Sequence, residues 1–195
     1  MIYAKGFIPE FISIFNMSPI IVGITSLARA GKDTFALRLV SKYSFIQLNM
    51  SDVLRDELVK QGKEPTKDNM SLLGDEWRKH YGKDIVIKRL LDKASTYEKV
   101  VITGLRSPEE VTYIKQQKPN LILVSVIAPL PLRFSRRTDL DPQTIEEFVA
   151  RDERDIKNKG LDMVIEMSDY KVWNLGTLDE LYGEVDKFII YANTK

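Results

Sequence analysis

Continuous apolar runs alternate with amphipathic segments along most of the chain, and this alternation predicts buried strands separated by helices. Apolar runs without polar interruptions are typical of strands that are buried on both faces of a parallel sheet. The predicted strands are residues 20–24, 44–48, 100–102, 121–127 and 170–173. Strands that alternate with helices predict an α/β fold in which helices cover both faces of a five-stranded parallel sheet.

Local capping signals mark where several of the helices begin. Ser107 and Thr177 each stand three residues before a glutamate, which is the sequence of a capping box. The predicted N-terminal caps are Thr66, Ser107, Asp141 with Pro142, and Thr177. The helical segments are 34–40, 51–62, 66–82, 84–94, and the residues that follow 107, 141 and 177.

A turn between the first predicted strand and the first predicted helix has the context of a phosphate-binding loop. Successive backbone N–H groups in such a loop, with the positive end of the following helix, bind phosphate oxygens. Gly31 lets the backbone approach the phosphates, and Lys32 is predicted to reach the β- and γ-phosphates of ATP. The predicted nucleotide-binding residues of this loop are Ala28, Arg29, Ala30, Gly31, Lys32, Asp33 and Thr34. The loop therefore predicts a three-layer α/β/α P-loop NTPase fold that uses ATP and Mg²⁺.

Two positions of the loop depart from the pattern G-x-x-x-x-G-K-[ST]. Ser26 stands at the first glycine, and Asp33 stands at the hydroxyl residue that binds magnesium. Asp33 can still hold Mg²⁺ as an oxygen ligand, while Thr34 is free to contact the α-phosphate; both are candidate metal-binding residues. The alternative is a helix N-terminus with a coincidental Gly-Lys pair, which the strand before it and the helix after it disfavour.

The segment 28–34 resembles the R-x-G-K-D-T loop of deoxynucleoside monophosphate kinases, and the resemblance extends along residues 20–189. Residues 51–55 resemble the acceptor segment of this group and of dephospho-CoA kinases, and residues 73–85 resemble the acceptor-side helices of its phage-type and archaeal members. Residues 168–181 are similar to the ending of dephospho-CoA kinases and of archaeal adenylate-kinase-related proteins. The kinase-like domain fused to some deoxycytidylate deaminases shares residues 141–142, 146–148 and 152–154. The resemblance implies a P-loop nucleotide kinase but singles out no acceptor.

Polar residues after the second and third strands are candidates for binding the acceptor of the phosphoryl group. They are Asp52, Arg55, Arg78 and Arg106. Phosphoryl transfer needs cations for a phosphate on the acceptor and a carboxylate that orients the attacking oxygen. Asp52, expected beside the phosphate loop, is by resemblance a candidate general base, and capping its helix is the alternative. Residues 51–95 are therefore predicted to be the acceptor-binding helices, and the acceptor to be a small molecule that carries a phosphate.

Arg133, Arg136 and Arg137 form the densest basic cluster, in a segment, 131–160, whose composition resembles that of a lid. In related kinases such a lid closes over ATP, excludes water and stabilises charge on the transferring group. By this resemblance Arg136 is a candidate ATP-binding residue. The candidate catalytic residues are Lys32, Asp52, Arg133 and Arg137. A solvated helix face is the alternative for the arginine cluster.

The turn after the last predicted strand contains Asn174 and Gly176. By resemblance this turn holds the adenine of ATP, so both residues are candidate nucleotide-binding residues. Ordinary turn chemistry also favours asparagine and glycine, and this is the alternative.

The third predicted strand lacks a carboxylate at its end, where a Walker B residue is expected. Relatives place an aspartate at the position of Thr103 or of Gly104. This loss is also what a nucleotide-binding sensor descended from a kinase would show, and such a sensor is the alternative function. A GTPase is disfavoured, because no aspartate stands three residues before any glycine and no N-K-x-D motif occurs.

Composition and charge exclude several other classes of function. The formal net charge is +1, which gives no reason to expect nucleic acid or an anionic membrane as a partner. There is no cysteine and only one histidine, His80, so cysteine-ligated zinc and a histidine metal site are excluded. Residues 1–16 are apolar but too short to span a membrane and lack a secretory signal, so a cytoplasmic protein is expected. They are predicted to be an appended extension or a homodimerisation arm, and residues 17–195 the kinase domain.

Overall fold

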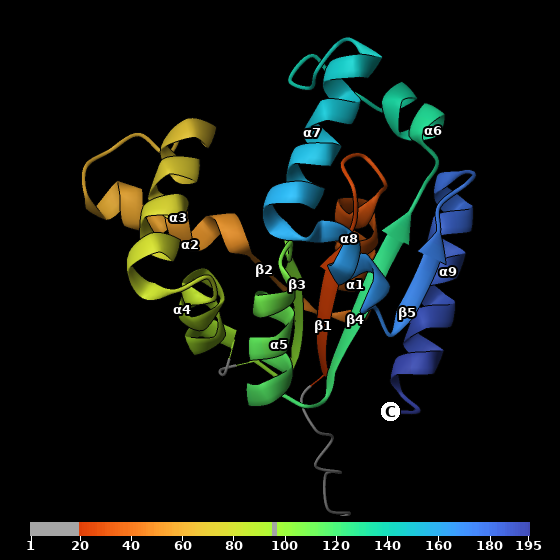
Figure 1. Ribbon diagram of the computed structural model, residues 1–195. Helices are drawn as coiled ribbons and strands as arrows, with labels where there is room; N and C mark the ends of the chain where they lie inside the picture. The colour runs from red at the N-terminus through yellow and green to blue at the C-terminus, as the bar shows by residue number, and fades with distance from the viewer. Residues whose placement is uncertain (1–19, 95–96) are drawn as a thin grey trace, which may run out of the picture.

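A parallel five-stranded sheet forms the centre of the protein, in the order β2-β3-β1-β4-β5 (Figure 1). The computed structural model describes residues 20–94 and 97–195. The strands are β1 (Ile20–Thr25), β2 (Ile46–Asn49), β3 (Lys99–Thr103), β4 (Leu121–Ile127) and β5 (Tyr170–Trp173). Each neighbouring pair is parallel, so the predicted sheet is confirmed. The extension 1–16, and with it the predicted homodimer contact, lies outside the described residues.

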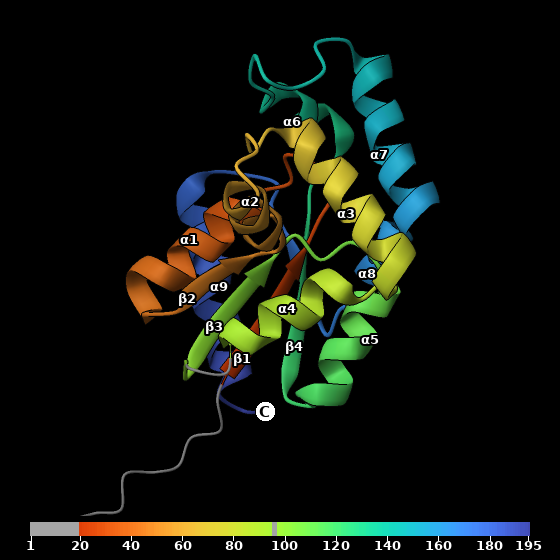
Figure 2. The same ribbon diagram turned by 90° about the vertical axis from the view of Figure 1, so that its left-hand side faces the viewer.

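Helices cover both faces of this sheet, which gives three layers (Figure 2). The helices are α1 (Lys32–Tyr43), α2 (Met50–Lys60), α3 (Lys67–Tyr81), α4 (Ile85–Ala94), α5 (Pro108–Gln117), α6 (Leu130–Ser135), α7 (Ile145–Lys159), α8 (Leu161–Glu166) and α9 (Leu178–Ala192). Helices α1 and α9 pack on one face, and α4, α5 and α8 pack on the other. Among the described helices, none combines the length and apolar character that crossing a membrane requires.

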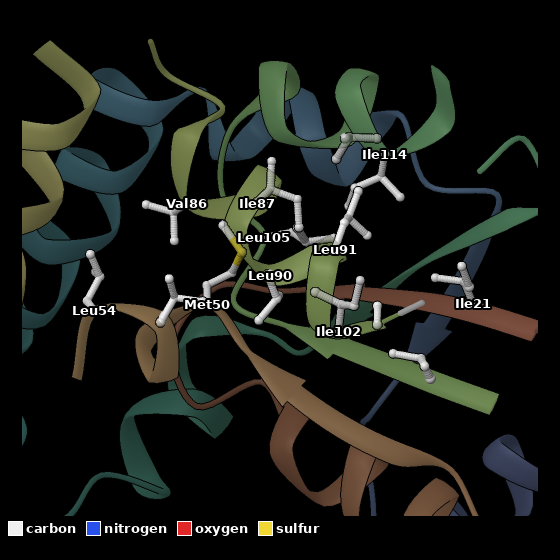
Figure 3. Packing of buried hydrophobic residues seen from close by; sticks show 14 of the residues in the cluster. Ile21, Met50, Leu54, Val86, Ile87, Leu90, Leu91, Ile102, Leu105 and Ile114 are labelled. Carbon is white, nitrogen blue, oxygen red and sulfur yellow. The ribbon is translucent and has the colours of Figure 1, made fainter. Parts of the chain in front are cut away.

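Successive residues of a strand point to opposite faces, and this alternation fills two separate apolar clusters. In β1, Val22 and Ile24 are fully buried among residues of α1 and α9, whereas Ile21 packs with α4 and α5 (Figure 3). A Cβ on Gly23 would lie 2.7 Å from a methyl group of Leu105, so the glycine leaves room for that leucine in the core. The end of β1 is therefore held firmly on both faces beneath the loop that follows it.

Three of the predicted helix starts are confirmed by their hydrogen bonds. The hydroxyl groups of Thr66, Ser107 and Thr177 each accept the backbone N–H three residues further on. Ser107 and Thr177 form complete capping boxes, because the glutamate side chain also accepts the N–H of the cap residue. These local signals therefore determine where α3, α5 and α9 begin.

The predicted helix cap at Asp141 and Pro142 is wrong. Helix α7 begins at Ile145, and the hydroxyl group of Thr144 accepts the N–H of Glu147 at 3.3 Å. The Asp141 carboxylate instead accepts hydrogen bonds from two arginine side chains. Helices α6 and α8 are not predicted from the sequence, because six residues contain too little periodicity to be recognised.

All the strands of the sheet end at one edge, toward which the arrowheads in Figure 1 point. The phosphate loop leaves this edge after β1, Arg106 follows β3, and Asn174 follows β5. Strand β3 separates β2 from β1, so Asp52 in α2 lies one strand further from the phosphate loop than expected. Open α/β sheets bind their ligands at this edge, and the candidate residues therefore gather where a site is expected.

Candidate active site

The loop after β1 has the backbone geometry of an anion-binding loop. Gly31 has a φ of 110° and is the N-cap of α1, and Arg29 has a φ of 62°, so the chain turns sharply before the helix. A left-handed conformation at Gly31 suits a residue without a Cβ. The first N–H bonded within the helix is that of Phe35, which donates to the carbonyl of Gly31 at 3.0 Å. The helix itself therefore does not use the N–H groups of residues 32–34, and such groups attract anions.

Lys32 and Asp33 form an ion pair at the start of α1. The Lys32 Nζ lies 2.7 and 2.8 Å from the two carboxylate oxygens of Asp33, whose side chain is 73% exposed. Because the lysine has a flexible stem, its ammonium group can exchange this carboxylate for phosphate oxygens. Asp33 and Thr34 are the residues of the loop that would hold Mg²⁺, since this ion prefers oxygen ligands.

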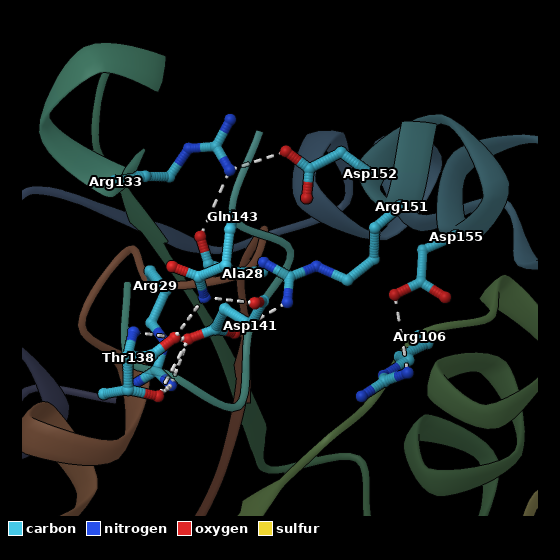
Figure 4. A network of polar contacts seen from close by, with 10 residues as sticks. All are labelled: Ala28, Arg29, Arg106, Arg133, Thr138, Asp141, Gln143, Arg151, Asp152 and Asp155. Carbon is cyan, nitrogen blue, oxygen red and sulfur yellow. Dashed lines mark hydrogen bonds and ion pairs between the residues drawn. The ribbon is translucent and has the colours of Figure 1, made fainter. Parts of the chain in front are cut away.

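Arg133 lies inside the protein and not in an exposed lid. Its side chain is 5% exposed and forms an ion pair with Asp152 of α7 at 2.6 Å (Figure 4). Its guanidinium group also donates to the carbonyl oxygens of Ala128 and Ala28, each at 3.1 Å. Arg133 therefore supports the phosphate loop in this structure, and a direct contact with the transferring phosphoryl group stays a prediction.

Arg136 and Arg137, the other two residues of the basic cluster, have different surroundings. Arg136 Nη2 donates to the side-chain and main-chain oxygens of Asn174 at 3.3 and 3.4 Å. Within the described part of the chain, Arg136 Nη1 and the hydroxyl of Ser26 in the phosphate loop are buried without a hydrogen-bond partner. Buried polar atoms are normally hydrogen-bonded, so a polar ligand or a water molecule at the loop would supply the missing partners. Arg137 is exposed, with its guanidinium carbon 4.1 Å from the centre of the Phe134 ring.

Asn174 points toward the phosphate loop. The residue is 6% exposed, and its Nδ2 donates to the carbonyl oxygen of Ala30 at 2.8 Å. Gly176 lies in a surface pocket of about 360 Å³. The pocket is lined by Trp173, Asn174, Leu175, Gly176, Glu180, Leu181 and Glu184. A Cβ on Gly176 would lie 1.7 Å from the Glu180 carboxylate, so the capping box of α9 requires a glycine here. The pocket suits the expected adenine-binding role of this turn, which stays a prediction.

Asp141 links the phosphate loop to α7, a contact that the local sequence does not reveal. Arg29 Nε donates to its carboxylate at 2.6 Å, and Arg151 Nη1 does so at 2.7 Å (Figure 4). The backbone N–H of Thr138 adds a third bond at 2.9 Å. Burial alone would raise the pKa of Asp141, but the N–H of Thr138 and the two guanidinium groups outweigh it and hold the pKa well below its usual range. The carboxylate therefore stays ionised and keeps Arg29 in place.

Glu110 joins two of the predicted acceptor-binding arginines. Its buried carboxylate accepts the backbone N–H groups of Arg106 at 2.9 Å and Ser107 at 3.2 Å, and it lies 3.8 Å from Arg78 Nη2. Burial raises the pKa of Glu110, against the opposing effects of the Arg106 N–H and the charge of Arg78. The sequence shows Glu110 as part of a capping box, but its contact with Arg78 depends on how α3 packs beside α5.

The remaining acceptor candidates also pair with carboxylates. Arg55 contacts Asp52 one turn away on α2, and these side chains are 48% and 45% exposed. The side chain of Arg106 lies 3.4 Å from Asp155 of α7 and is 48% exposed. Arg55, Arg78 and Arg106 therefore each lie near a carboxylate, and their side chains are 48%, 32% and 48% exposed.

The end of β3 has no carboxylate, as the sequence indicated. Thr103 is fully buried and accepts a hydrogen bond from Gln47 at 3.3 Å, and Gly104 has a φ of 90°. Over residues 20–94 and 97–195, no group of three or more His, Cys, Asp or Glu side chains is arranged to hold a metal ion. A bound Mg²⁺ would therefore depend on the residues of the phosphate loop and on the phosphates of the nucleotide.

Comparison with known proteins agrees with this geometry. A family model described as an AAA domain matches residues 28–159. A UPF0200 protein of Thermococcus kodakarensis is 34% identical over 180 residues, which cover 87% of this chain and 96% of the relative. A UPF0200 protein of Methanothermobacter thermautotrophicus is 33% identical over 168 residues, which cover 83% of this chain and 85% of the relative.

Solved structures share the fold at much lower identity. Shikimate kinase from Bacteroides thetaiotaomicron superimposes with a TM-score of 0.59 at 12% identity, over 87% of this chain and 98% of that enzyme. The protein TT1252 from Thermus thermophilus superimposes with a TM-score of 0.57 at 20% identity, over 92% of this chain and 100% of that protein. These likenesses show the three-layer α/β/α P-loop fold. The chain belongs to the AAA domain family and to the archaeal UPF0200 proteins, and it has the fold of the P-loop kinase group that its sequence resembles.

Proposed function

We propose that this protein is an ATP-dependent kinase that transfers the γ-phosphoryl group to a small acceptor that already carries a phosphate, such as a nucleoside monophosphate or dephospho-CoA. One observation carries the proposal. The phosphate loop and the candidate arginines lie in segments that follow β1, β2 and β3, and these three strands end at the same edge of the sheet. The phosphate loop after β1 suits the nucleotide, and the arginines after β2 and β3 suit the acceptor. In the order β2-β3-β1, the segment after β3 lies next to the loop and the segment after β2 lies one strand further away, which supports an acceptor side next to the nucleotide side.

On the nucleotide side, this chain supplies backbone N–H groups and one mobile cation. The N–H groups of residues 32–34 and the ammonium of Lys32 would bind the phosphates and stabilise the charge that develops during transfer. Bound ATP with Mg²⁺ would supply the phosphoryl group and neutralise part of its charge. Arg136, whose Nη1 is buried without a partner in the described residues and whose Nη2 donates to Asn174, would add a donor.

On the acceptor side, guanidinium groups match the oxygens of a phosphate. The buried carboxylate of Glu110 lies near the guanidinium group of Arg78 and accepts the backbone N–H of Arg106, whose own guanidinium group pairs with Asp155. Arg55 and Asp52 add a cation and a carboxylate from α2. Asp52 would orient the attacking oxygen of the acceptor, because its carboxylate lies at the start of α2, directly after β2, and contacts the candidate Arg55.

A panel of acceptors tested with ATP and Mg²⁺ checks the function directly. We expect a nucleoside monophosphate or dephospho-CoA to be phosphorylated, while the corresponding nucleoside without phosphate reacts at least about tenfold more slowly, since it lacks a charged hydrogen bond to the arginines. The measurement is ADP formation together with identification of the phosphorylated product. Equal rates with and without the acceptor phosphate would contradict the acceptor class.

Arg55→Ala and Arg106→Ala are expected to raise the KM for the acceptor or lower kcat, with ATP affinity nearly unchanged. Each lost charged hydrogen bond should cost roughly 1.5–3 kcal/mol. Lys60→Ala, an exposed cation at the end of the same helix α2, is the matched control and should behave as the wild-type protein. The test is calorimetric titration of ATP and of the acceptor into each variant. If the variants lose ATP and keep the acceptor, the two sides of the site are reversed.

A nucleotide-binding sensor without turnover is the second candidate, favoured by the absence of a carboxylate at Thr103 and Gly104. Such a protein would bind ATP through the same loop and change conformation without transferring the phosphoryl group. The acceptor panel separates the two functions. ATP binding without product formation, for every phosphate-bearing acceptor, would favour the sensor.

A further inference from the structure

Two carbonyl groups of the phosphate loop are hydrogen-bonded by side chains from outside the loop. Arg133 donates to the carbonyl of Ala28 at 3.1 Å, and Asn174 donates to the carbonyl of Ala30 at 2.8 Å. The carbonyl of one residue and the N–H of the next belong to the same planar trans peptide and point in opposite directions. A donor that holds the carbonyl of Ala30 on one side therefore turns the N–H of Gly31 to the other side.

Asn174 is itself rigidly held, which a positioning residue requires. Its backbone N–H donates to the carbonyl of Ile127 at 2.8 Å, and this bond continues the pairing of β5 with β4. Its side-chain oxygen accepts from Arg136 Nη2 at 3.3 Å. The residue is 6% exposed, so water competes little for these bonds.

The same amide nitrogen of Asn174 also lies close against Gly31. A Cβ on Gly31 would lie 2.3 Å from Asn174 Nδ2, well inside the contact distance of the two atoms. Gly31 is therefore required for the approach of the asparagine as well as for its left-handed φ of 110°. The side chain of Asn174 occupies the space that the missing Cβ of Gly31 leaves open.

We propose that Asn174 is a positioning residue of the phosphate loop, which holds the peptide between Ala30 and Gly31 with its N–H toward the phosphates, and that it is not a base-contacting residue. This rests on the proposed nucleotide site, and it changes the role expected for Asn174 from the sequence. Without the Nδ2 donor, the peptide is free to rotate and to present the carbonyl of Ala30 to the anion, which repels it.

Binding of inorganic tripolyphosphate and of ATP tests this role without any acceptor. Asn174→Leu keeps the size of the side chain and removes the donor, and Asn174→Ala removes the donor without adding bulk. Both variants should lose affinity for tripolyphosphate and for ATP by the same factor, about tenfold for one lost buried hydrogen bond. Lys171→Ala, on the same strand β5 and paired with Glu166 on the surface, is the control and should bind both probes as the wild-type protein does.

Calorimetry measures the affinity of each variant for tripolyphosphate and for ATP, and thermal melting checks that the fold is intact. Equal losses for both probes, with a melting temperature close to that of the wild-type protein, support the proposal. A loss of affinity for ATP alone would show that Asn174 contacts the base. Unchanged affinity for both ATP and tripolyphosphate would show that Asn174 does not position the loop. Either result overturns the proposal while the kinase assignment stands. A wild-type protein that binds neither probe would overturn both.

Discussion

Lys32→Ala is expected to lower kcat for phosphoryl transfer by at least about 10²–10³-fold while the fold stays intact, as for the loss of one group that stabilises transition-state charge. The lysine belongs to neither apolar cluster, and among the described residues it pairs with the exposed carboxylate of Asp33. Its removal therefore takes away phosphate-binding charge without opening a cavity. A coupled assay of ADP formation would measure the loss of kcat, and circular dichroism would check that the fold is intact.

The matched control is Lys42→Ala, a lysine at the other end of the same helix α1. Lys42 pairs with Asp186 of α9 on the surface, and an exposed pair of this kind adds little to stability. The control should retain full activity and a similar melting temperature. Turnover in Lys32→Ala equal to that of the control would refute the assignment of the phosphate loop.

Asp152→Ala is expected to destabilise the protein by about 3–5 kcal/mol, since it leaves the charge of Arg133 buried and unpaired. The two side chains are 5% and 9% exposed, and their ion pair at 2.6 Å joins α6 to α7. For a chain of this length, the melting temperature should fall by roughly 10 °C or more. Thermal melting followed by circular dichroism would measure the change.

Two further variants show which physical effect is responsible. Glu153→Ala changes the next residue of α7, which is exposed, and should alter the melting temperature little. The double variant Arg133→Met, Asp152→Leu removes both charges and should recover most of the stability, because no buried charge is left without a partner. The prediction fails if Asp152→Ala melts as the wild-type protein does.

Much of the architecture follows from the sequence because its signals are local. The run of residues 121–127 is buried on both faces, and β4 has those bounds. The capping boxes at Ser107 and Thr177 lie within four residues each, so α5 and α9 begin where the sequence predicts. The phosphate loop is equally local, because Gly31 and Lys32 stand directly between a buried strand and a helix.

The roles of several polar side chains were settled by the packing of distant segments. Asp141 carries the sequence signal of a helix cap, but its partner Arg29 is 112 residues away. Arg133 looks like a lid residue by composition, yet α7 closes over it and supplies Asp152. Neither partner can be recognised from neighbouring residues.

The sequence by itself determined the order of the five strands and of the longer helices, the caps of three helices and the place of the phosphate loop, since each depends on residues close together in the chain. The tertiary structure alone decided the strand order β2-β3-β1-β4-β5 and the partners of the buried charges. It also brought Asn174 into contact with Gly31 and with the carbonyl of Ala30, which is 144 residues away in the sequence. The physical reason is that a buried polar group must find a partner wherever the packing of the elements places one, and sequence separation does not limit that choice.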